Sequence, residues 1–199
     1  DVNGLIEKGR ENVLLQSNNF NDAIWTKKFS SVTSNQIGYD GSNDAWLIEK
    51  SAASGRVQQI QSGTGVSTFS VYAKAGTLNY MRLRAFGSSN PSCFFDFTDG
   101  SIHNNDGISA TMTSVGGGWY RCSYSFVSSL IEVQIYPADS TSSVSGTSGS
   151  IYIQDSQLES GLVSTSVIET GASTAQAGIL EALPRLDYSG GASCPSLLL

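Results

Sequence analysis

A strict alternation of apolar and polar residues in the stretch 67–86 constrains the fold more than any other feature of this sequence. Every second residue is apolar over 69–75, and the pattern resumes over 81–85 after a break at Gly76. Successive side chains of a β-strand point to opposite faces, so a period of two places all the apolar residues on one face. The stretch therefore predicts two half-buried strands, each with an apolar face toward a core and a polar face toward solvent.

The same alternation recurs along the chain in short segments that are separated by turn residues. Roughly ten strands at spacings of about 8–15 residues are typical of an antiparallel β-sandwich, and we favour a jelly roll. The low charged content, 14%, suits short strands and polar turns better than helices. The expected strands are 13–15, 31–37, 45–49, 56–61, 67–75, 80–86, 93–97, 108–113, 119–126, 131–135 and 151–159. The residues expected between the two sheets include Phe69, Val71, Ala73, Met81, Leu83, Tyr120, Cys122 and Tyr124.

Composition divides the chain into one module and two ends. We expect an N-terminal connector at 1–12, the sandwich at 13–170 and a C-terminal linker or docking segment at 171–199. Within the last segment, 173–183 has a helical spacing of apolar residues that Pro184 would end, which predicts a short helix. This segment is expected to lead to a further module or to pack on another chain.

Charge and cysteine usage exclude several classes of partner. A net charge of −6 argues against nucleic acid and against an anionic membrane surface. No run of about 18 apolar residues is present, so membrane insertion is not expected. With three widely spaced cysteines and His103 as the only histidine, neither a disulfide framework nor a zinc site is expected. Cys93 and Cys122 are interpreted as small buried residues of strands.

The polar positions of the two central strands form a candidate ligand-binding surface. A carbohydrate site needs aromatic rings and planar polar groups together on one solvent-facing sheet. The alternative is that these are ordinary solvated positions, or that the two arginines pair with Asp96 or Glu132 across strands. The candidate residues are Tyr72, Lys74, Tyr80, Arg82 and Arg84. Trp119 and Arg121 form a second candidate pair, although a Trp after three glycines also suits the edge of a sandwich.

Catalytic patterns are absent from the sequence, which predicts a protein that is not an enzyme. Asp96 and Asp99 are too close along one hairpin for the carboxylate pair of a glycosidase. His103 lies in a turn-like segment, where a solvated role is expected rather than Ser/His/Asp catalysis. The glycines before Trp119 lack the strand–loop–helix context and the lysine of a phosphate loop.

Five phrases along the chain carry a resemblance to a known family. NVLLQSNNFNDAIWTK, FSVYAKAG, FFDFTDGSI, VGGGWYRCS and IYIQDSQLESGLVSTSVIETGAS occur in this order between about Asn12 and Ser173. They resemble a module repeated in bacteriophage tail and virion-appendage proteins, which is similar to the jelly-roll carbohydrate-binding modules attached to glycoside hydrolases. The resemblance implies a non-catalytic virion module, assembled in the host cytoplasm, for structural assembly or attachment to a surface glycan. Its expected partners are a glycan or other virion subunits, and homo-oligomerisation is left open. The alternative is an extracellular carbohydrate-binding module of a polysaccharide-degrading enzyme.

The resemblance also implies a metal site. Modules of this kind often hold a structural calcium ion between the first loop and the last strand. Asn19, Asp22 and Asp155 are then the expected oxygen donors. The alternative is that Asp22 caps a turn and Asp155 lies on the surface. No other cofactor is expected.

Overall fold

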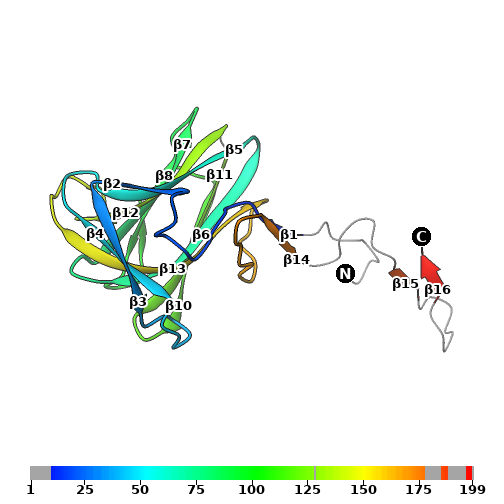
Figure 1. Ribbon diagram of the computed structural model, residues 1–199. Coiled ribbons are helices and arrows are strands. Elements are labelled where there is room, and N and C mark those ends of the chain that lie inside the picture. Colours follow the sequence, from blue (N-terminus) through cyan, green and yellow to red (C-terminus); the bar gives the residue numbers. More distant parts are fainter. Residues whose placement is uncertain (1–9, 128, 178–184, 188–195, 199) are drawn as a thin grey trace.

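The computed structural model describes residues 10–127, 129–177, 185–187 and 196–198. Two six-stranded sheets, antiparallel throughout, lie face to face as a sandwich (Figure 1). Within these residues all regular secondary structure is β, and no helix long and apolar enough to cross a membrane is found there. The predicted all-β antiparallel sandwich is confirmed.

Twelve of the sixteen strands in the described residues divide equally between the two sheets. The first sheet contains, in spatial order, β10 (Ser109–Gly116), β11 (Trp119–Val127), β6 (Val66–Ala75), β13 (Gly149–Ser160), β4 (Ala45–Lys50) and β3 (Ser30–Gln36). The second contains β2 (Trp25–Lys28), β5 (Arg56–Gly63), β12 (Leu130–Ala138), β7 (Tyr80–Gly87), β8 (Ser92–Asp96) and β9 (Ile102–His103).

The order of the strands is that of a jelly roll. From β4 to β7 the chain crosses between the sheets at every connection. Later in the chain, β12 inserts between β5 and β7 in the second sheet, and β13 inserts between β6 and β4 in the first. Strands distant in sequence therefore lie side by side at the centre of each sheet. A surface at the centre of either outer face therefore combines residues from segments that are distant in sequence.

The core lies where the period of two predicts it. Met81 and Leu83 have no exposed surface, so the predicted register of β7 is correct. Phe69, Val71, Ala73, Cys122 and Tyr124 are equally buried, and Tyr120 is partly buried against the same core. Cys93 is also fully buried, which confirms the interpretation of Cys93 and Cys122 as core residues.

The segment 13–15 is not a strand, contrary to the prediction. A side chain replaces the missing partner strand, because the amide of Gln59 donates to the Leu15 carbonyl and accepts from the Leu15 N–H, both at 2.8 Å. Leu14 is fully buried between these contacts. The alternation over 13–15 thus reflects burial of one residue and not a ladder of backbone hydrogen bonds.

Outside the sandwich, the described residues form two small sheets of two strands each. β1 (Arg10–Asn12) pairs with β14 (Ala175–Ala177), and β15 (Arg185–Asp187) pairs with β16 (Ser196–Leu198). Ala175–Ala177 is therefore extended where a helix was predicted. Its backbone hydrogen bonds to β1 stabilise the extended conformation, whereas a short helix must first form an energetically unfavourable first turn. The rest of the predicted helix, 178–183, lies outside the described residues, and the division into connectors and module remains a prediction.

Three consecutive glycines make the turn between β10 and β11. Gly116, Gly117 and Gly118 have φ values of 96°, 60° and 81°, which residues with a Cβ rarely adopt. The turn allows Trp119 to begin β11 directly, so that the glycine run sets the register of the outer strand pair.

Candidate functional site

The structure divides the predicted surface between two faces of the sandwich. Tyr72 and Lys74 lie on β6, in the first sheet, whereas Tyr80, Arg82 and Arg84 lie on β7, in the second. The prediction that these five residues share one sheet face is wrong, because the connection after Gly76 crosses between the sheets. A period of two specifies which residues face outward but not which strands pair.

The outer face of the second sheet gathers the arginines of the chain's central strands. One row of cross-strand neighbours runs from Tyr136 on β12 through Arg82 on β7 and Phe94 on β8 to His103 on β9. A parallel row joins Gln58, Gln134, Arg84 and Ser92. We call the following residues the arginine face: Arg56, Gln58, Arg82, Arg84, Ser92, Phe94, Gln134 and Tyr136.

Cations and rings alternate along the first row. The guanidinium carbon of Arg56 lies 5.4 Å from the ring centre of Tyr136, and that of Arg82 lies 5.5 Å from the same ring. Arg82 is also 5.4 Å from the ring centre of Phe94. All three distances are within the range of cation–π attraction. The rings of Tyr136 and Phe94 are consequently almost completely covered, with 2% and 5% of their residue surface exposed.

The two arginines of β7 retain unused hydrogen-bond donors. Arg82 donates from Nη2 to Ser92 Oγ at 3.1 Å, whereas the Arg84 guanidinium lies 5.0 Å from the centre of the Phe86 ring and donates to none of the described residues. Among the described residues no acceptor reaches the Nε of either arginine. Burial lowers the pKa of Arg82 below its ordinary value, as expected for a cation that has lost water without gaining an ion-pair partner.

The cross-strand ion pairs considered as the alternative are not formed. Glu132 accepts instead from Gln58 Nε2 at 2.6 Å and from the Gln134 amide. Asp96 accepts from the backbone N–H of Thr98 at 2.8 Å. Tyr80, which lies opposite Asp96 at the start of β7, is partly exposed at the end of the arginine face.

The outer face of the first sheet carries the other candidate residues. The rings of Tyr39 and Tyr72 stack with their centres 3.6 Å apart, and the Arg121 guanidinium lies 4.5 Å from the Tyr72 ring centre. Arg121 donates to Ser70 Oγ at 2.7 Å and to the Asp155 carbonyl at 3.1 Å. Its donors are thus engaged within the fold, in contrast to those of the arginine face.

Trp119 and Lys74 are cross-strand neighbours at the end of this face. Trp119 is 3% exposed, so its ring is packed and offers no surface to a ligand. Lys74 is partly exposed.

Asp155 is a buried carboxylate at an irregular point of β13. It lies where the pairing of β13 with β6 shifts register, and its φ is 52°. Tyr39 donates to its Oδ2 at 3.2 Å, while its Oδ1 has no partner among the described residues. Burial and the nearby charge of Glu169 raise the pKa of Asp155 to about 6. Burial also raises the pKa of Tyr39.

The three predicted calcium donors occupy different settings. Asp22 accepts from the Ile24 N–H at 2.9 Å, as a turn cap does, and Asn19 is exposed. The neighbour of Asp155 is Asn18, whose Oδ1 accepts from the Asp155 N–H at 3.1 Å. Asp155 contributes a buried oxygen without a partner, and the described part of the chain contains no group of three His, Cys, Asp or Glu side chains arranged for a metal. The calcium site remains a prediction.

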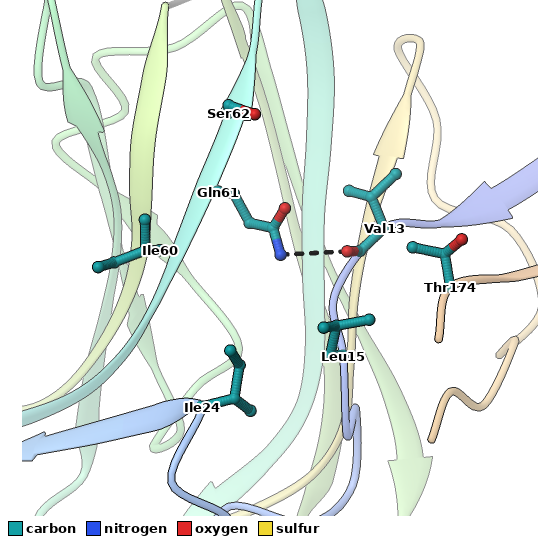
Figure 2. A pocket seen from close by; sticks show the side chains of 7 residues that line it. All are labelled: Val13, Leu15, Ile24, Ile60, Gln61, Ser62 and Thr174. Atoms are coloured by element: carbon teal, nitrogen blue, oxygen red, sulfur yellow. Dashed lines mark hydrogen bonds between the residues drawn. The ribbon is translucent and has the colours of Figure 1, made fainter. Parts of the chain in front are cut away.

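An apolar groove borders β5 beyond the part of this strand that pairs with β2. Figure 2 shows Gln61 reaching across it to the Val13 carbonyl, to which its Nε2 donates at 3.1 Å. The groove has a volume of about 560 Å³ and includes Ile60, which is 69% exposed. Its lining residues are Val13, Leu15, Ile24, Ile60, Gln61, Ser62 and Thr174.

Comparisons with known proteins identify no family for this chain. No family model and no curated protein sequence matches it. Among solved structures, it is similar to the CBM22-1–GH10 modules of the Clostridium thermocellum xylanase 10B complexed with xylohexaose, at 14% identity and a TM-score of 0.47. It is also similar to TmCBM61 in complex with β-1,4-galactotriose, at 12% identity and a TM-score of 0.45. A third is the enzymatically active domain of bacteriophage CBA120 tailspike protein 4, at 13% identity and a TM-score of 0.40.

The extent of these similarities differs. They cover 82%, 75% and 74% of this chain, respectively. The chain spans 30% of the xylanase chain and 21% of the tailspike chain, but 99% of the TmCBM61 chain.

Sequence reasoning found only Arg82 and Arg84 among the eight residues of the arginine face. Arg56 and Gln58 alternate with buried Val57 and Gln59 on β5, and Gln134 and Tyr136 flank buried Ile135 on β12. The alternation of inward and outward residues on β5 and β12 can be predicted from the sequence. The strand order that places β5 and β12 in one sheet with β7 cannot.

Proposed function

We propose that this chain is a non-catalytic module of a virion appendage that attaches to a surface glycan through the arginine face. The observation that carries the proposal is the row of Tyr136, Arg82 and Phe94, extended by Arg56, across four strands of one outward sheet face. Arg82 and Arg84 are partly exposed, and apart from the bond from Arg82 to Ser92 their Nη groups donate to none of the described residues, so these groups are suited to bind the oxygen atoms of sugars.

The virion setting rests on the resemblance of the five sequence phrases. In that setting the module would also contact other virion subunits or further copies of itself. The second candidate is a carbohydrate-binding module of an extracellular polysaccharide-degrading enzyme. It is favoured equally by the arginine face, since both candidates bind glycan at the same surface.

A glycan array with the purified, labelled module tests the proposal. We expect binding to a restricted set of glycans, which is lost in the variant Arg82→Gln/Arg84→Gln. Ile60→Ala, which changes an exposed residue of the neighbouring groove, is the matched control and should bind normally. The proposal is overturned if no glycan binds a folded sample, or if the double variant binds as the wild type does.

The non-catalytic part of the proposal needs its own assay. Incubation of the module with the glycans it binds should release no new reducing ends. Antibody against the module should label intact virions if the appendage assignment is correct. Labelling of a secreted polysaccharide-degrading enzyme instead would establish the second candidate.

A further inference from the structure

We propose that the arginine face selects acidic glycans and binds a sugar carboxylate, as in a uronic or sialic acid, between Arg82 and Arg84. This inference rests on the proposed glycan binding and specifies its ligand class. It follows from how the two guanidinium groups are held, from their unused donors and from the covered state of the rings beside them.

The guanidinium of Arg82 is held in a fixed orientation. It lies beside the rings of Tyr136 and Phe94, at 5.5 and 5.4 Å, and donates to Ser92 Oγ. A guanidinium held in this way loses little additional freedom when it binds a ligand. It therefore presents a preorganised planar group of N–H donors.

The unused donors match a carboxylate better than a hydroxyl. Each guanidinium has five N–H donors in a rigid fork. In the described residues, Arg82 uses one donor on Ser92 and Arg84 uses none; the Nε of each is buried, so the Nη groups are the donors that a ligand reaches. A carboxylate accepts two parallel bonds from such a fork, with the added strength of opposite charge, whereas a sugar hydroxyl accepts a single neutral bond.

The rings of the arginine face do not offer the surface that neutral sugars need. A pyranose binds an aromatic ring by stacking on its open face. Tyr136 and Phe94 are 2% and 5% exposed because arginines lie over them. Affinity at this face must therefore come from charge and hydrogen bonds.

The carboxylates nearest to the arginines do not occupy the binding position. Glu132 is held by the side chains of Gln58 and Gln134. Asp106 is exposed and lies beyond Ser92, which donates to its Oδ2 at 3.4 Å. In a chain of net charge −6, two cations without a close anion are the feature that a ligand carboxylate would complete.

The experiment compares one polymer with and without its carboxylates. Polygalacturonic acid and its carboxyl-reduced galactan share a backbone, and titration calorimetry measures the affinity of the module for each. We expect the acid form to bind about tenfold more tightly or better. The preference should shrink between about 50 mM and about 0.5 M NaCl, because salt screens a charged contact. Polysialic acid with its carboxyl-reduced form provides the second acid class.

Two variants separate charge from geometry. Arg84→Gln, which removes no hydrogen bond, should lower affinity for the acid polymer about tenfold and leave that for the reduced polymer unchanged. Arg84→Lys should retain part of the affinity, since it keeps the charge without the fork. Ile60→Ala is again the control.

The outcomes are distinguishable. Equal affinity for the acid and reduced polymers of both pairs overturns the acidic-glycan inference and leaves the proposed function standing. Binding that is confined to the neutral glycans of the array likewise overturns the acidic-glycan inference and leaves the proposed function standing. No binding of any glycan by the folded module overturns both. A preference for acid that survives Arg82→Gln/Arg84→Gln places the acid site elsewhere and overturns this assignment.

Discussion

Arg82 and Tyr136 are directly opposed on neighbouring antiparallel strands, with the guanidinium carbon 5.5 Å from the ring centre. Because Arg82 also lies over Phe94 and donates to Ser92, it stabilises the sheet as well as forming a candidate site. A purely solvated arginine would contribute almost nothing to stability. The neighbouring Arg84, with one ring contact and no hydrogen bond to the described residues, provides an internal comparison.

We therefore expect Arg82→Ala to lower the free energy of unfolding by about 2 kcal/mol and Arg84→Ala by less than about 1 kcal/mol. The difference is expected because Arg82 makes two cation–π contacts and one hydrogen bond, whereas Arg84 makes a single cation–π contact, with the partly exposed Phe86. Urea unfolding at pH 7 measures both values. Equal losses would show that the contacts of Arg82 with the two rings add nothing to stability.

A buried ion pair joins β4 to the start of the loop after β12. Lys50 Nζ contacts Asp139 Oδ1, and the lysine side chain has no exposed surface. Removal of one partner leaves a buried charge unpaired, so Asp139→Asn should cost about 3 kcal/mol or more in urea unfolding.

The double variant Lys50→Met/Asp139→Asn is the control for that change. Replacement of the buried cation by an apolar side chain of similar length should recover most of the loss. The Gly146 N–H, which donates to Asp139 Oδ2 at 2.6 Å, keeps an acceptor in both variants. If the double variant is as unstable as Asp139→Asn, the loss comes from the loop and not from the unpaired lysine.

Two core cysteines should be unreactive in the folded protein. Burial raises the pKa of Cys93 to about 12 and that of Cys122 well above 9.0, so neither forms a thiolate near neutral pH. Iodoacetamide at pH 8, followed by peptide mass spectrometry, should leave both unlabelled until urea unfolds the chain. Labelling of either residue at the rate of a free thiol, in native buffer, would contradict the placement of these side chains in the core.

Local periodicity predicted most strands of the two sheets but not β2 and β9, and strand pairing determined which residues share the candidate site. Met81 and Leu83 were assigned to the core correctly because the period of two depends only on the backbone of one strand. The assignment of Tyr72 and Arg82 to one surface failed because it assumed that β6 and β7 pair, whereas β6 lies between β11 and β13 in one sheet and β7 lies between β12 and β8 in the other. Strand order in a jelly roll depends on contacts between residues far apart in the sequence, which the pattern of one short segment cannot predict.

Two further residues show the same limit. Gln59 looks like a surface position of β5, yet it is 1% exposed and replaces a strand by bonding to Leu15. Asp155 was predicted as a metal donor or a surface residue, and it is a buried carboxylate that accepts from Tyr39. In both cases a polar side chain is buried because a distant segment supplies its hydrogen bonds, a relationship that composition and spacing do not encode.

The carboxyl of Asp155 should make stability depend on pH in the direction opposite to a salt-bridged acid. Its pKa is raised from 3.8 to about 6, so the folded state binds more protons than the unfolded state between these values. This contribution to stability is complete below about pH 4, is lost as the pH rises through about 6, and amounts to roughly 3 kcal/mol. Thermal unfolding from pH 4 to pH 8 should show the wild type losing stability over that window relative to Asp155→Asn, which has no charge to bury and tolerates the positive φ.

Asp40→Asn is the matched control for this prediction. Hydrogen bonds from Ser42 lower the pKa of the exposed Asp40, so its charged form is the stabilising one and its contribution is lost as the pH falls. Asp40→Asn should therefore leave the fall in stability between pH 4 and pH 6 in place, while Asp155→Asn removes it. A wild type and an Asp155→Asn variant with parallel pH profiles would mean that the Asp155 carboxylate is compensated in solution, by a cation or by ordered water at its unpaired Oδ1.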